Sequence, residues 1–167
     1  MKRIGLLSDT HGYLDDRILY YLDACDEIWH AGDIGSIEIL RKLETIKPLR
    51  AVYGNIDGNP LRIGLSRDLR FRCEDVDVWI THIGGHPKHY PANILDQLRI
   101  NPPKLFICGH SHILKIIYDK QFNMLCVNPG AAGIQGFHHV RTMVRFTVDN
   151  DKLKDMEVIE LGQRAVI

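Results

Sequence analysis

The sequence predicts an α/β fold built on a parallel sheet. Three short apolar segments, residues 4–7, 27–30 and 49–53, each end in a polar loop and alternate with segments whose apolar residues have helical spacing. Strands alternate with helices in this way when right-handed crossovers build a parallel sheet. Because parallel strands end at one edge, where α/β proteins place their sites, we expect a functional site along that edge.

Bulk composition favours one ordinary globular domain over residues 1–167, since 45% of the residues are hydrophobic and 25% are charged. The formal net charge of zero gives no strong signal for nucleic acid or for a membrane surface as the main partner. No apolar run is long enough for a signal peptide or a membrane span, so we expect a cytoplasmic protein. A homo-oligomer is compatible with the sequence, which leaves the oligomeric state open.

The cysteines are widely spaced and show no paired pattern. Two of them lie in apolar, strand-like runs. We therefore expect buried, reduced thiols rather than disulfides or a zinc knuckle at Cys25, Cys73, Cys108 and Cys126.

The first half of the chain contains the expected crossovers. Apolar residues recur at helical spacing in residues 13–24. They recur again after Ser36, a good helix cap, and Pro48 marks the end of that second helix. A dense cluster of turn-forming residues at 54–60 closes this half.

After Pro60 the pattern becomes mixed. Residues 69–73 and 76–81 are expected to pair as antiparallel strands, and a helix at 92–100 must end before Pro102. A short apolar strand follows at 105–108. We expect the chain to finish with antiparallel strands at residues 113–118, 124–127, 140–148 and 154–161.

Potential metal ligands follow the ends of these strands. Asp9 and His11 are two residues apart, so in an extended segment both side chains leave the same side, and His110 and His112 repeat that spacing. Taken alone, each such residue more often has a structural role: aspartate and asparagine commonly form turns, and a histidine at a strand end is commonly hydrogen-bonded. Their joint occurrence at one rim favours metal binding. The complete set is Asp9, His11, Asp33, Asn55, His82, His110 and His112.

The donor types indicate which cations would fit. Neutral imidazole nitrogens and hard oxygens without thiolate suit divalent manganese, iron, nickel, cobalt or zinc. Seven donors exceed the needs of one four-coordinate ion, so the sequence predicts a site for two metal ions.

These motifs resemble those of the calcineurin-like metallophosphoesterases, specifically the small single-domain phosphodiesterases of bacteria and archaea. The resemblance extends from Lys2 to about Gly133 and implies a four-layer α/β/β/α sandwich of two mixed β-sheets flanked by helices. The motifs that carry it are Asp9-Thr10-His11, Gly32-Asp33, Gly54-Asn55 followed by Asp57, the isolated His82, and Gly109-His110-Ser111-His112.

The resemblance also implies roles for the seven residues. Asp33 would bridge two cations, manganese being expected first and nickel, iron, cobalt or zinc being alternatives. Asp33, Asn55 and His82 are the expected catalytic residues. One cation would be held by Asp9, His11 and His112, and the other by Asn55, His82 and His110.

The implied activity is that of a metal-dependent phosphoesterase. We expect a phosphodiesterase that hydrolyses small phosphodiesters with a hydroxide activated by a dinuclear metal centre. Two alternatives stay open: a phosphomonoesterase with the same site, and a non-catalytic metal-binding scaffold, similar to the retromer subunit that keeps this fold with an altered metal site. The intact ligand set weighs against the scaffold.

Some positions depart from the family pattern or lie outside it. Many relatives have a histidine directly after the asparagine, where this chain has Ile56, so another group or water must protonate the leaving oxygen. His86 is a candidate, although we expect it to be a solvated loop residue. His30 is expected to be buried and hydrogen-bonded. We expect His138 and His139 to be exposed unless residues 133–139 form a lid.

Overall fold

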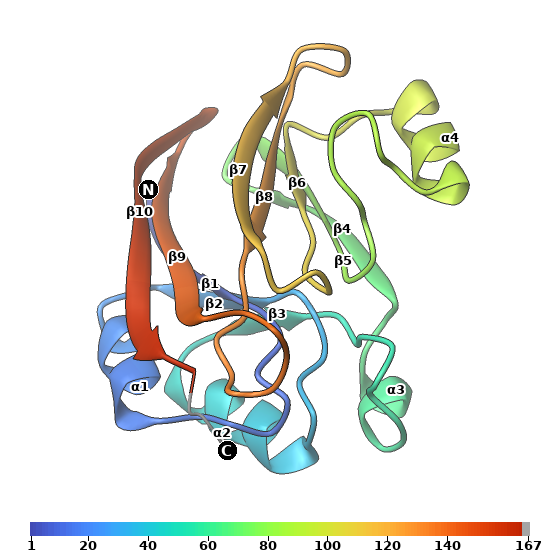
Figure 1. The fold of residues 1–167 in the computed structure, drawn as a ribbon. Coiled ribbons are helices and arrows are strands. Elements are labelled where there is room, and N and C mark those ends of the chain that lie inside the picture. Colours follow the sequence, from blue (N-terminus) through green and yellow to red (C-terminus); the bar gives the residue numbers. More distant parts are fainter. Residues whose placement is uncertain (165–167) are drawn as a thin grey trace.

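The computed structural model describes residues 1–164, and in it the chain forms two five-stranded sheets packed face to face, with helices on the outer sides (Figure 1). This is the two-sheet sandwich that the resemblance implied. The last three residues of the expected domain lie outside the described residues.

The first sheet has the strand order β10-β9-β1-β2-β3. Its three parallel strands come from the predicted crossover units, and β9 pairs antiparallel with β1 and β10. The strands are β1 (Lys2–Leu7), β2 (Glu27–His30), β3 (Leu49–Ala51), β9 (Val140–Asp149) and β10 (Lys152–Gln163).

Two capped helices cover the outer face of this sheet. Helix α1 (Asp16–Asp23) begins after Asp15, whose carboxylate accepts the Ile18 N–H at 3.0 Å. Helix α2 (Ile37–Ile46) begins after Ser36, as predicted. Caps of this kind stabilise a helix by about 1 kcal/mol. The apolar faces of both helices pack on the sheet around Leu7 and Ile28.

The second sheet has the strand order β4-β5-β6-β8-β7 and carries helix α4 (Ala92–Ile100) on its outer face. The hairpin of β4 and β5 is antiparallel, as predicted, and β6 runs parallel to β5. Its strands are β4 (Asp68–Cys73), β5 (Val76–Thr81), β6 (Leu105–Ile107), β7 (Leu114–Asp119) and β8 (Met124–Pro129).

The closing strands differ from the prediction of one antiparallel run. The hairpin of β7 and β8 belongs to the second sheet, where β8 is parallel to β6, whereas the hairpin of β9 and β10 joins the first sheet. Strand β6 is buried along its whole length, and β8 covers its free edge. The short helix α3 (Leu61–Gly64) was not predicted.

The core between the sheets is apolar and aromatic. Trp29 lies at its centre, with its ring 5.1 Å from that of Phe71 and 5.5 Å from that of Phe146 in edge-to-face arrangements. The four cysteines are buried, as predicted. Among the described residues, no helix has the length and apolar character needed to cross a bilayer.

Candidate metal centre

Loops from both sheets meet where the parallel strands end. Backbone hydrogen bonds join the loops after β1 and β2, since the Asp9 N–H donates to the Gly32 carbonyl and the His11 N–H to the Asp33 carbonyl, each at 3.0 Å. The His110 N–H, from the second sheet, donates to Asp9 Oδ2 at 3.1 Å. The predicted rim is therefore one connected structure.

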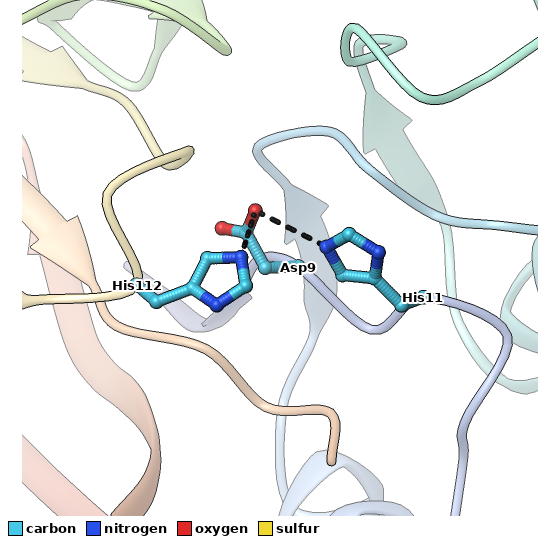
Figure 2. Close-up of side chains that lie close together, drawn as sticks. All are labelled: Asp9, His11 and His112. Carbon is cyan, nitrogen blue, oxygen red and sulfur yellow. Dashed lines mark ion pairs between the residues drawn. The ribbon is translucent and has the colours of Figure 1, made fainter. Parts of the chain in front are cut away.

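The first cluster contains Asp9, His11 and His112 (Figure 2). The two imidazoles flank one oxygen of the carboxylate, because Asp9 Oδ1 lies 3.2 Å from His112 Nε2 and 3.8 Å from His11 Nε2. The other oxygen, Oδ2, accepts hydrogen bonds from Ser8 Oγ at 2.7 Å and from the His110 N–H. One oxygen thus anchors the side chain, and the other faces the cluster.

The Asp9 carboxyl group is held ionised in the protein without metal. Its complete burial favours the neutral form and would raise its pKa. The His11 and His112 imidazoles next to the carboxylate outweigh burial and bring the pKa of Asp9 well below its ordinary value. The site therefore presents a negative charge to a cation.

The second cluster contains Asp33, His82 and His110. His82 Nδ1 lies 2.7 Å from the Ala31 carbonyl oxygen, which can only accept, so Nδ1 carries the proton and leaves Nε2 free to face Asp33. Asn55 lies beside this cluster, with Oδ1 3.0 Å from His110 Nδ1. Asn55 and His110 are both exposed.

One oxygen of Asp33 lies between the two clusters. Asp33 Oδ2 is 3.1 Å from His82 Nε2 and 3.6 Å from His11 Nε2, whereas Oδ1 accepts the Ile56 N–H at 3.1 Å. Burial would raise the pKa of Asp33, but the His82 imidazole 3.1 Å away lowers it below its ordinary value. Asp33 therefore has the position and the charge of a carboxylate that can bridge two cations.

Buried polar atoms without partners test whether a cation fits. Among the described residues, Asp9 Oδ1, His11 Nε2 and His82 Nε2 are buried and have no hydrogen-bond partner. Each such atom costs about 1–3 kcal/mol when nothing compensates it. The two nitrogens lie within 3.6 Å of Asp33 Oδ2, and Asp9 Oδ1 lies within 3.9 Å of both nitrogens. Divalent cations would satisfy these atoms, so the donor set fits metal ions.

The backbone of the ligand loops is unusual. A residue other than glycine rarely adopts a positive φ, at a cost of about 1–3 kcal/mol, and such strain often marks functional sites. In this fold the left-handed conformation turns side chains at the strand ends toward the clusters. The candidate ligands that adopt it are Asp9 (54°), His11 (45°), Asp33 (54°), His110 (70°) and His112 (60°).

Asp57 organises the loops around Asp33. The sequence places Asp57 in the Gly54-Asn55 motif but does not predict this role. Its buried carboxylate accepts the backbone N–H groups of Ile34, Gly35 and Gly54 at 2.8–3.1 Å. Gly54 must lack a side chain, because a Cβ atom there would lie 2.0 Å from Asp33 Oδ1. The loop can therefore approach Asp33 closely.

His30 contacts the loops that carry both clusters, and it is buried and hydrogen-bonded, as predicted. Its Nδ1 accepts the Gly32 N–H at 3.1 Å, so the neutral ring carries its proton on Nε2, 3.0 Å from Thr10 Oγ1. Thr10 in turn donates to the Ile34 carbonyl at 3.0 Å. Burial lowers the pKa of His30 to about 4, which keeps the ring neutral.

His138 differs from the prediction, because it is half-buried and contacts the first cluster. Its Nε2 lies 2.9 Å from the Gly133 carbonyl oxygen and must donate, so its Nδ1 accepts. That Nδ1 lies 3.3 Å from His112 Nδ1. Donation from His112 Nδ1 leaves His112 Nε2 unprotonated toward Asp9. His139 is exposed, as predicted.

Asn128 holds the loop that carries His110 and His112. Its amide nitrogen lies 2.9 Å from the Gly109 carbonyl oxygen and 3.1 Å from Ser111 Oγ. Asn128, near the end of β8, thus braces this loop.

Comparisons with known proteins identify the family of the chain. The model of the calcineurin-like phosphoesterase superfamily domain matches residues 1–151. A probable metallophosphoesterase of Methanothermobacter thermautotrophicus is 32% identical over 172 residues, covering 95% of this chain and 92% of that protein.

Two solved structures are similar in fold. An archaeal phosphodiesterase superposes with a TM-score of 0.74 at 20% identity, covering 95% of this chain and 98% of the other. Vps29 of Entamoeba histolytica, crystallised with Zn²⁺, superposes with a TM-score of 0.74 at 15% identity and coverages of 96% and 99%. At these identities the likeness concerns the fold.

Proposed function

Because the chain belongs to the calcineurin-like phosphoesterase superfamily, we propose that it is a metal-dependent phosphodiesterase that hydrolyses small phosphodiesters. The observation that carries the proposal is the position of Asp33 Oδ2 between two clusters whose buried donor atoms lack partners. The proposed ligands are Asp9, His11 and His112 on one side, Asn55, His82 and His110 on the other, and Asp33 between them.

Two divalent cations, when bound, supply Lewis acidity toward the phosphate and a hydroxide near neutral pH. The protein keeps the centre positive, because the imidazoles are neutral ligands and Asp9 and Asp33 together contribute only two negative charges. The anionic phosphate is therefore attracted. Manganese is the first metal we propose, with nickel, iron, cobalt and zinc as alternatives.

The residues proposed for catalysis are Asp33, Asn55 and His82. The Ile56 N–H fixes one oxygen of Asp33, and the Ala31 carbonyl fixes the tautomer of His82, so both donors are oriented before substrate arrives. Orientation of this kind lowers the barrier by avoiding reorganisation during the reaction.

Ile56 cannot protonate the leaving oxygen, because its side chain has no acidic group. His86 is half-buried rather than fully solvated, and it lines a hollow of about 150 Å³ together with His110, so we propose it for this task. Nitrophenolate is a stable anion and leaves without a proton. Nitrophenyl esters therefore test the metal centre independently of any general acid.

The test is hydrolysis of bis(p-nitrophenyl) phosphate and p-nitrophenyl phosphate by metal-free protein titrated with manganese, nickel or zinc. We expect metal-dependent cleavage that favours the diester. Asp33→Asn should lower kcat/KM at least about 1,000-fold, since several kcal/mol of transition-state stabilisation depend on the metals.

Two results would contradict the proposal. Tight metal binding with no turnover of either ester would favour the non-catalytic scaffold. Turnover of the monoester alone would favour the phosphomonoesterase. The proposal also places the activity in the cytoplasm, which localisation of a tagged chain would check.

A further inference from the structure

A cavity of about 260 Å³ opens beside the second cluster. Asn55 and His82 form part of its wall, and Arg62, Arg67 and Tyr53 form another part. No carboxylate lines it among the described residues. The lining is therefore cationic and adjoins the place where a phosphoester would react.

Building on the proposed function, we propose that this cavity binds a second phosphate group of the substrate. The substrate class is then a small phosphodiester that carries a further phosphate at a short distance from the scissile one. A pocket of this volume lies below the roughly 300–1,000 Å³ of pockets that enclose whole drug-sized ligands. It fits one charged end of a substrate.

The Arg62 guanidinium is held in place without losing its charge. It donates to the backbone carbonyls of Asp57 and Asn55, the latter at 3.3 Å, and stacks on Tyr53 with its central carbon 4.7 Å from the ring centroid. Carbonyl oxygens and an aromatic face orient a guanidinium but do not neutralise it. The positive charge remains available to an anion.

Arg67 supplies a second cation. Within residues 1–164, its guanidinium makes no hydrogen bond or ion pair, and it lines the cavity. Its backbone is anchored beside β3, because the neighbouring Ser66 accepts the Tyr53 N–H at 3.1 Å and forms a bridge with Val52. The next residue, Asp68, lines a different hollow, as alternation along a strand requires.

The chemistry of guanidinium groups favours phosphate as the occupant. An arginine donates two parallel hydrogen bonds to phosphate oxygens, and such charge-assisted bonds are stronger than neutral ones. Two arginines on one wall, with the metal cluster on another, provide for two phosphates in one molecule. An uncharged substituent would leave Arg67 without a partner.

A matched pair of esters tests this. Thymidine 5′-(p-nitrophenyl phosphate) and the same ester with a 3′-phosphate contain one scissile bond and differ only in the added phosphate. We expect the manganese-loaded protein to show about 10- to 100-fold higher kcat/KM for the 3′-phosphorylated ester, mainly through KM. In Arg67→Gln the ratio should fall toward one.

The control is Arg41→Gln, which removes the same charge from an exposed position on α2 and should keep the ratio. Equal use of the two esters by the unmodified protein, or a ratio unchanged in Arg67→Gln, would overturn the inference. In either case cleavage of both esters would leave the phosphodiesterase proposal intact.

A binding measurement separates failure of the pocket from failure of the activity. Calorimetry compares thymidine 3′,5′-bisphosphate with thymidine 5′-monophosphate on the manganese-loaded protein. If neither ester is cleaved, tighter binding of the bisphosphate that Arg67→Gln abolishes would still support the pocket. Equal dissociation constants would reject it.

Discussion

The two metal clusters share Asp33 but differ in depth and in support. In the first, Asp9 is fully buried and its Oδ2 is fixed by Ser8 and by a backbone N–H from the other sheet. In the second, Asn55 and His110 are exposed and contact each other. None of the three ligands of the first cluster is exposed, whereas the second cluster exposes Asn55 and His110 to solvent beside the buried Asp33 and His82.

This difference indicates how the site divides its tasks. A cation in the first cluster would meet oriented donors none of which is exposed, so we expect tight binding and slow exchange. The second cluster opens toward the arginine-lined cavity, so we expect substrate to approach from that side. Exposed ligands are also more easily replaced by water, which predicts weaker binding there.

The largest expected effect compares the two histidines of one loop. His112→Ala should lower kcat/KM at least about 1,000-fold, because the first cluster would lose the imidazole nearest to the free oxygen of Asp9. His110→Ala should cause a loss that excess manganese largely reverses, because water can enter its exposed position. Manganese titrations of both variants with bis(p-nitrophenyl) phosphate measure the difference. Equal rescue of both variants would remove the distinction between the clusters.

A smaller effect is expected at His138, which acts through His112. His138→Ala should weaken manganese binding at the first cluster by about 10- to 100-fold, the usual cost of losing the partner of a ligating histidine. His138→Asn should restore much of it, because the amide oxygen can accept the same hydrogen bond. Calorimetric titration measures the affinity. The exposed His139→Ala is the matched control and should bind manganese normally.

If His138→Asn binds manganese as weakly as His138→Ala, the hydrogen bond to His112 is not what positions the ligand. The contact would then be one of packing alone.

The last expected effect concerns the stability of the metal-free protein, to which His30 contributes through its contacts with Thr10 and Gly32. The pKa of His30 in the folded protein is about 4, below its unfolded value of about 6.5. Its contribution is therefore complete above about pH 6.5 and is lost as pH falls toward 4, since the unfolded chain binds the proton first. Relative to His30→Gln, the unmodified protein should lose about 2 kcal/mol between pH 7 and pH 5.

Urea unfolding in the presence of a chelator measures this difference. Parallel pH dependences for the two proteins would show that the imidazole of His30 can be protonated inside the fold.

Much of the fold could be predicted because caps, prolines and apolar spacing are local features of the sequence. Ser36 before an apolar periodic segment predicted the start of α2, and Pro102 limited α4 correctly. The four-residue helix α3 is too short to show a helical period. The partners of β8 depend on contacts far along the chain, so the sequence predicted a strand there but not its parallel pairing with β6.

The same distinction applies to the candidate site: its candidate ligands could be predicted from local motifs, but the residues that support them could not. Asp9 and His11 could be identified because ligand types recur at strand ends, and the structure brings them together with the other candidates. The support of the site follows from three-dimensional contacts that no spacing reveals. Asp57 accepts hydrogen bonds from a loop more than 20 residues earlier, and His138 reaches His112 through a loop without periodic signal.

Anomalous diffraction from crystals grown with manganese would test the central claim most directly. We predict two peaks, one among Asp9, His11 and His112 and the other among Asn55, His82 and His110, with Asp33 Oδ2 bound to both. In Asp33→Asn the peak of the second cluster should weaken first. A single peak in the unmodified protein, or two peaks that do not share Asp33, would contradict the account.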